Sequence, residues 1–236
     1  MSRLKLAIIG VGLIGGSLGL CLKDKLGEDI YITGLCRHQA SMDRAVALGA
    51  VDYASADIES VVSDADIVFL SPPVLQIVPM VEKILPYLKK GCILTDAGST
   101  KGYIWQHLQK ILPDDIYYIA GHPMTGREKS GVDAAMKDLF VGKAYVIVED
   151  TGAPPEAHKK LMSVLKYTGA NCSTSPSTIA VLLSSATCRM SRLLRSSLCS
   201  TALAMTATPA SSSSAAASAT RRASLRRMLT CGPISA

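Results

Sequence analysis

Short apolar runs alternate along the first 171 residues with segments whose apolar residues recur every three or four positions. The apolar runs have the length and the β-branched content of buried strands, and the periodic segments have the spacing of amphipathic helices. Strands are predicted at 6–9, 30–35, 65–70, 92–95, 117–120 and 144–148. Helices are predicted from 17, and at 41–48, 76–89, 102–112, 132–139 and 154–167. This alternation predicts an α/β fold with a doubly wound, mainly parallel sheet.

A glycine-rich turn follows the first strand. Gly10, Gly12 and Gly15 have the spacing G-x-G-x-x-G, with Leu13 and Ile14 between them. The three glycines suit a tight reversal, a close approach of backbone to pyrophosphate, and close packing of helix on strand. These five residues are therefore predicted to bind a dinucleotide, although the motif alone also fits a turn without a ligand.

Polar clusters follow the other predicted strands as well. They are Arg37–His38, Ser71-Pro72-Pro73, 96–101 and 122–129. In a parallel sheet the carboxyl ends of the strands share one edge, where ligands bind. The convergence predicts a Rossmann-type nucleotide-binding domain, with Ser71 and Pro72 beside the cofactor.

The second strand bears on which cofactor is used. NAD-binding folds usually place an acidic residue about 20 residues after the glycines, where it binds the ribose 2′-hydroxyl. Here Cys36 and Arg37 occupy that region. Arg37 suits the 2′-phosphate of NADP, or is a solvated surface charge, so the cofactor is predicted as NAD or NADP.

His122 follows a predicted strand and faces the expected crevice. A histidine can accept a hydroxyl proton while hydride leaves, as a dehydrogenase requires. Ser99 can bridge a substrate hydroxyl and this histidine, or cap the next helix. The run 127–129 is either a solvated loop or the rim of the crevice.

Three motifs together resemble the prephenate dehydrogenase family. They are G-V-G-L-I-G-G-S at 10–17, D-A-G-S-T-K-G at 96–102 and G-H-P-M-T-G-R-E-K-S-G at 121–131. The resemblance covers about 4–171. It implies oxidative decarboxylation of prephenate to 4-hydroxyphenylpyruvate, a step of tyrosine biosynthesis. The cysteine usage separately predicts a reduced, cytoplasmic setting. Arogenate dehydrogenase and a different small-substrate dehydrogenase are the alternative enzymes.

The resemblance also implies residue roles. His122 matches the catalytic histidine that polarises the ring hydroxyl, and Ser99 matches the serine that hydrogen-bonds the same hydroxyl. Glu128 matches an acidic residue at the active-site entrance and is predicted to contact substrate. The family continues into a helical domain that forms a homodimer and supplies a substrate-binding arginine.

The composition limits which partners, metal sites and membrane segments are expected. Of the 25 Lys and Arg residues, seven lie in 172–236, which hold no acidic residue, so 1–171 carry 18 basic and 19 acidic residues. No nucleic-acid partner is expected from this balance. Seven cysteines without a C-x-x-C pair predict neither a disulfide framework nor a metal site. The apolar stretch 4–22 contains five glycines, so no membrane span is expected there.

The segment 172–236 departs from the family. It contains 16 Ser and 12 Ala and no Phe, Tyr or Trp, a composition that cannot build a helical core. Read with each codon starting one nucleotide earlier, 215–224 can encode G-G-G-F-R-D-T-T-R-I, which resembles the family's second domain. We therefore predict a nucleotide-binding domain at 1–171 and, after a frameshift near 171–177, a disordered or out-of-frame tail. The dimer domain would then be lost, and a catalytically inactive nucleotide-binding remnant is the alternative to an enzyme.

Overall fold

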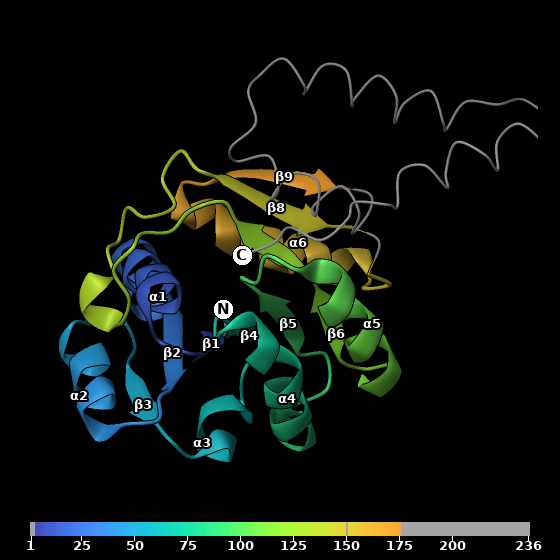
Figure 1. Ribbon diagram of the computed structural model, residues 1–236, viewed down its shortest axis with the longest axis horizontal. Coiled ribbons are helices and arrows are strands. Elements are labelled where there is room, and N and C mark those ends of the chain that lie inside the picture. Colours follow the sequence, from blue (N-terminus) through green and yellow to red (C-terminus); the bar gives the residue numbers. More distant parts are fainter. Residues whose placement is uncertain (1–2, 150, 176–236) are drawn as a thin grey trace, which may run out of the picture. The chain divides into compact units, whose positions relative to one another are not determined.

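The computed structural model describes residues 3–149 and 151–175, all within a compact unit that spans Met1–Arg189 (Figure 1). Strand β9, Asn171–Ser175, includes the first four residues of the predicted tail. The rest of that tail, and the strings that carry the frameshift hypothesis, lie outside the described residues. No helix in the described ranges is long and apolar enough to cross a membrane.

Six parallel strands form the main sheet, in the order β3-β2-β1-β4-β5-β6. Their bounds are β1 Leu4–Ile9, β2 Ile30–Leu35, β3 Tyr53–Ser55, β4 Ile67–Leu70, β5 Ile93–Asp96 and β6 Tyr117–Ile119. The chain order reverses between β1 and β4, and at such a reversal a crevice opens beyond the strand ends. The predicted parallel, Rossmann-type sheet is confirmed.

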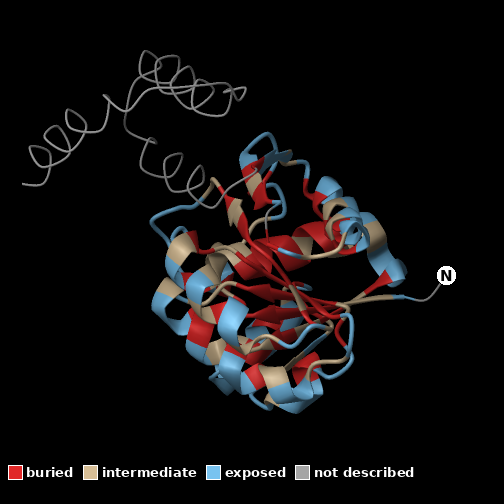
Figure 2. Ribbon diagram, turned by 90° about the vertical axis from the view of Figure 1, so that its right-hand side faces the viewer, coloured by how far each residue is buried: buried red, intermediate tan, exposed pale blue. Residues whose placement is uncertain are grey.

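Helices cover both faces of this sheet. They are α1 Leu13–Leu26, α2 Gln39–Ala47, α3 Ile58–Val62, α4 Val74–Ile84, α5 Lys101–Ile111 and α6 Pro155–Leu165. Within β1, Leu6 and Ile8 pack into the apolar cluster that contains α1, α2 and α6. Ala7 and Ile9 pack into the cluster that contains α3, α4 and α5. Both faces of the strand are therefore buried, which explains its uninterrupted apolar sequence (Figure 2).

A second sheet of three strands follows the first. It has the order β7-β8-β9, with β7 Gly121–Pro123 antiparallel to β8 Ala144–Val148, and β8 parallel to β9. His122 therefore lies within a short strand paired with Val146, rather than in a loop beyond the main sheet. The chain passes from one sheet to the other at Ala120, between β6 and β7.

The segment predicted as a helix at 132–139 is mostly irregular. Only Val132–Ala134 forms a 3-10 turn, η3. The amide of Met136 donates to Ser17 Oγ on α1 at 2.9 Å instead of to a helical carbonyl. This bond fastens the segment to α1, so tertiary packing overrides the local helical pattern.

Candidate active site

The glycine turn connects β1 to α1 in a conformation that requires glycine at two positions. Gly10 has φ +87°, which side chains rarely adopt. A Cβ on Gly15 would lie 2.6 Å from the Gly10 carbonyl oxygen and from Ser71 Oγ, and 2.7 Å from an Ile8 methyl. The glycines therefore allow the turn and the close packing of helix on strand, as the spacing predicted.

Gly12 differs, because a Cβ there would meet no atom within 4 Å. It is the N-cap of α1, and no side chain caps that helix end. The first-turn N–H groups and the positive end of the helix dipole are therefore free to receive an anion. This arrangement fits the pyrophosphate of a dinucleotide, and Leu13 and Ile14 form the helix start beside it.

Ser71 and Pro72 adjoin this turn from the end of β4. Ser71 Oγ donates to the Gly10 carbonyl at 2.8 Å, and its amide bonds to Ile9 at 2.9 Å. Pro72 N would lie 3.1 Å from a Cβ on Gly10. These two residues therefore shape the turn, and their contact with the cofactor stays a prediction. Arg37 is exposed just after β2 and forms no ion pair with a described residue.

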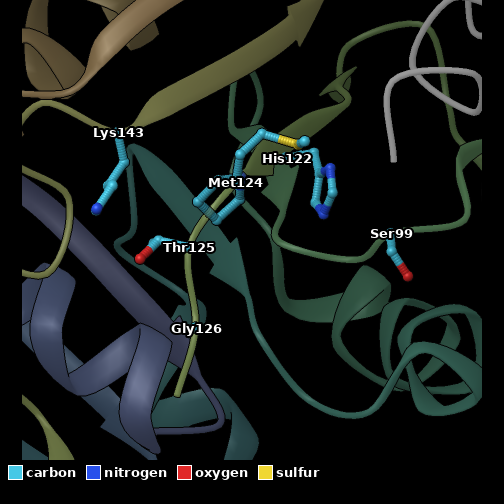
Figure 3. Close-up of a pocket in the computed structure, with 7 residues that line it drawn as sticks. Ser99, His122, Met124, Thr125, Gly126 and Lys143 are labelled. Atoms are coloured by element: carbon cyan, nitrogen blue, oxygen red, sulfur yellow. The ribbon is translucent and has the colours of Figure 1, made fainter. Parts of the chain in front are cut away.

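Ser99 and His122 line one cavity of about 480 Å³. Ser99 comes from the loop between β5 and α5, and His122 from β7 (Figure 3). The other lining residues are Pro123, Met124, Thr125, Gly126 and Lys143. The two predicted catalytic residues are thus brought to the same space from segments 23 residues apart, without a hydrogen bond to each other. The N-cap position of helix α5 is Thr100, which makes no side-chain capping bond, so Ser99 does not occupy the capping position that the sequence suggested.

The imidazole of His122 is set up as a neutral base. Burial lowers its pKa from the ordinary 6.5, and the nearby Lys101 ammonium lowers it further, while Asp96 opposes the shift. Nδ1 is buried without a hydrogen-bond partner in the described chain. Nε2 also has no described partner, but it is not buried, so it is the ring nitrogen that a ligand in the cavity can meet.

Lys143 gives this cavity its charge, and the sequence reasoning missed it. It stands just before β8 and forms no ion pair with a described residue, and no acidic residue lines the cavity. In the view of Figure 3, Lys143 and Ser99 lie on opposite sides of His122. A cavity with one lysine and a neutral histidine favours an anionic ligand. No motif marked Lys143, because it is separated from His122 by 20 residues of irregular chain.

Glu128, predicted to contact substrate, is exposed and is not among the residues that line the cavity. Two side chains that precede Glu128 anchor its loop. Thr125 Oγ1 donates to the Leu139 carbonyl at 3.1 Å, and Arg127 contacts Met136 Sδ at 3.2 Å. Glu128 thus lies on an exposed loop next to the site rather than within it. No group of three or more His, Cys, Asp or Glu residues in the described ranges could hold a metal ion.

Comparison with known proteins decides the family. Residues 18–174 match the family described as "Prephenate dehydrogenase, nucleotide-binding domain". The chain belongs to the prephenate dehydrogenase family. The resemblance seen in the sequence motifs is therefore confirmed, and the nucleotide-binding role expected of the domain agrees with the matched description.

Individual members of the family are also similar to this chain in sequence. The chain is 33% identical over 175 residues to prephenate dehydrogenase of Bacillus subtilis (strain 168), covering 72% of this chain and 47% of that protein. It is 34% identical over 152 residues to cyclohexadienyl dehydrogenase of Zymomonas mobilis, covering 64% and 51%. The chain thus spans about half the length of the curated relatives it matches.

Solved structures of the family have the same fold. Synechocystis arogenate dehydrogenase superposes with a TM-score of 0.71 at 28% identity, covering 97% of this chain and 75% of that one. Aquifex aeolicus prephenate dehydrogenase, in complex with hydroxyphenyl propionate and NAD+, gives 0.71 at 28% identity, covering 89% and 72%.

Proposed function

We propose that this chain carries the cofactor site and the proton-accepting histidine of a dehydrogenase that oxidatively decarboxylates prephenate to 4-hydroxyphenylpyruvate. The observation that carries the proposal is the joint lining of one cavity by Ser99, Lys143 and a neutral His122. The Aquifex relative, solved with hydroxyphenyl propionate and NAD+, supports a phenyl-carboxylate ligand and a nicotinamide cofactor.

The residues have distinct roles in this reaction. Bound NAD(P)+ would accept the hydride from the ring carbon that bears the hydroxyl. His122 Nε2 takes the hydroxyl proton, and Ser99 holds the hydroxyl oxygen in line with the ring nitrogen. Lys143 binds a carboxylate of the substrate. The ring carboxyl leaves as CO2, the electron pair of the broken C–C bond completes the aromatic ring, and protonated His122 returns the proton to the resulting phenolate oxygen.

The cofactor is held by the turn from Gly10 to Gly15, with the pyrophosphate over the exposed backbone of Gly12. Arg37 lies where the ribose 2′-position is expected and selects NADP over NAD. Glu128 is retained as a residue of the entrance that orients the incoming substrate. The reaction is placed in the cytoplasm, as expected for a biosynthetic dehydrogenase.

An assay of the full chain tests this function. Prephenate and arogenate are each offered with NAD+ and with NADP+, and the reduced nicotinamide is followed by its absorbance. Turnover with prephenate supports the proposal. Turnover with arogenate but not with prephenate would instead make the chain an arogenate dehydrogenase, the activity named for the Synechocystis relative. Cofactor binding without any turnover supports the inactive remnant. Resequencing the gene across codons 171–177 then shows whether a missing or extra base is the cause.

A further inference from the structure

A buried ion pair lies directly beneath the candidate site. Lys101 Nζ is 2.5 Å from Asp96 Oδ2, and both side chains have an exposed fraction of 0%. Two charges removed from water are costly unless hydrogen bonds satisfy the remaining lone pairs. The pair belongs to the end of β5 and the start of α5, on either side of Ser99.

The carboxylate of Asp96 satisfies its lone pairs from two segments, the loop that carries Ser99 and the strand β7 that carries His122. Oδ2 accepts the amide of Gly98, the residue before Ser99, at 2.9 Å. Oδ1 accepts the Tyr118 hydroxyl at 2.7 Å and the amide of Gly121, the residue before His122, at 3.4 Å. One side chain is therefore bonded to the immediate neighbour of each candidate catalytic residue.

Both neighbours are glycines, and the close approach requires it. A Cβ on Gly98 would lie 2.9 Å from Asp96 Oδ2. A Cβ on Gly121 would lie 3.0 Å from Thr95 Oγ1 and 3.1 Å from the Asp96 carbonyl oxygen. A side chain at either position would therefore force these neighbours to shift. Both segments thus pack closely around Asp96.

The pair also sets the electrostatic surroundings of His122. The Lys101 ammonium lowers the pKa of the imidazole and the Asp96 carboxylate raises it, in addition to the larger lowering by burial. Burial lowers the pKa of Lys101 itself, and Asp96 opposes that shift. Removing Lys101 alone would therefore leave His122 facing an uncompensated carboxylate.

We propose that Asp96, neutralised by Lys101, is a positioning residue that fixes the relative placement of Ser99 and His122. Asp96 does not line the cavity, so it acts through the backbone of the Ser99 loop and of strand β7, and not on the substrate. The inference rests on the roles proposed above for Ser99 and His122. Its tests need neither substrate nor turnover, so an inactive chain leaves them interpretable.

Amide exchange measured by NMR on the full chain tests the hydrogen bonds. In Asp96→Asn, the new NH2 group replaces one of the two acceptor oxygens, so it faces either Lys101 and the Gly98 amide or Tyr118 and the Gly121 amide, and the remaining oxygen is uncharged. We expect the Gly98 and Gly121 amides to exchange about tenfold faster or more, since each loses a bond to a charged acceptor. The amides of Ile93 and Tyr117 are the controls, because they lie at the other ends of β5 and β6. They donate to the backbone carbonyls of Asp66 and Cys92, respectively, and their exchange rates should change little.

The double variant Asp96→Asn/Lys101→Met removes both charges together, and it replaces the single variant if that one fails to fold. Faster exchange confined to Gly98 and Gly121 in either variant supports the proposal. Unchanged exchange at these two amides overturns it. Equal acceleration at all four amides also overturns it, because Asp96 would then contribute only general stability.

A histidine titration by NMR tests the role of Lys101. In Lys101→Met the pKa of His122 should rise, because a neighbouring cation is lost and the Asp96 carboxylate stays. The matched control is Lys160→Met. In the original protein the Lys160 ammonium pairs with Asp66 at 3.2 Å, and Asp66 lies just before β4, at the end of the sheet away from the site. A loss of stability alone would not move this pKa. An unmoved His122 titration in Lys101→Met would contradict the proposed coupling.

Discussion

The glycine turn allows a prediction that separates cofactor binding from stability. Gly12 faces open space, whereas Gly15 is enclosed by Ile8, Gly10 and Ser71. Alanine at the two positions should therefore have opposite effects. Gly12→Ala should weaken dinucleotide binding and leave the unliganded protein as stable as before, while Gly15→Ala should destabilise the protein even without cofactor.

The size of each effect follows from the contacts. A Cβ on Gly15 would make three contacts of 2.6–2.7 Å, and overpacking of this kind costs about 1–3 kcal/mol. Alanine gains up to about 1 kcal/mol over glycine inside a helix, which offsets part of that cost. A net loss of about 1–2 kcal/mol lowers Tm by roughly 2–8 °C in a domain of this size. Gly12→Ala adds no protein contact, so its stability should stay within about 0.5 kcal/mol of the original.

Thermal unfolding with and without NAD+ or NADP+ measures both quantities, since a ligand that binds only the folded state raises Tm. Gly12→Ala should unfold normally but lose most of the rise that the cofactor produces. Gly19→Ala is the matched control, because its Cβ would strike the Ala50 carbonyl from the middle of α1. That variant should lose stability and keep its cofactor response. A Gly12→Ala protein that binds both dinucleotides like the original would refute the pyrophosphate site.

The other predictions concern the cavity and the ribose. His122→Asn should lower kcat about 10²–10⁴-fold in any active form of the chain, and near-normal turnover would remove His122 from the mechanism. Since His122 must be neutral and burial holds its pKa below the ordinary 6.5, kcat/KM should stay level near neutral pH and fall only at pH values below 6.5. Arg37→Asp should shift the ratio of NADP to NAD affinity toward NAD, and an unchanged ratio would make Arg37 a surface charge. Lys143→Gln should weaken binding of hydroxyphenyl propionate in calorimetry, whereas Lys129→Gln, outside the cavity, should not.

The sequence predicted the main sheet well because its strands are continuous apolar runs. β3, Tyr53–Ser55, was missed, since three half-exposed residues give no periodic signal. β9, Asn171–Ser175, was missed because it is polar and pairs only at the edge of the second sheet. The start of α1 was placed at Ser17 rather than Leu13, because glycines conceal a helix that tertiary packing supports.

The candidate site was predicted only in part. His122 and Ser99 were found because motifs carry them, and the structure brings them to one cavity. Asp96 and Lys101 lie in one of those motifs. Their spacing does not reveal that they form a buried ion pair, because the burial depends on the tertiary fold. The position of His122 in a second sheet was equally hidden, since β7 is only three residues long.

The central place of β1 has a consequence for how the chain folds. Its partner β4 lies some sixty residues further along, with Leu6 beside Ile67, and the turn at Gly10 is held by Ser71. Such non-local pairing is slow to form, because a long loop must close before any contact is gained. During synthesis β1 therefore emerges first, but it cannot pair with β4 until the middle of the domain has been made. A nascent chain that ends before Ser71 has the complete glycine motif but not the scaffold that gives the motif its shape.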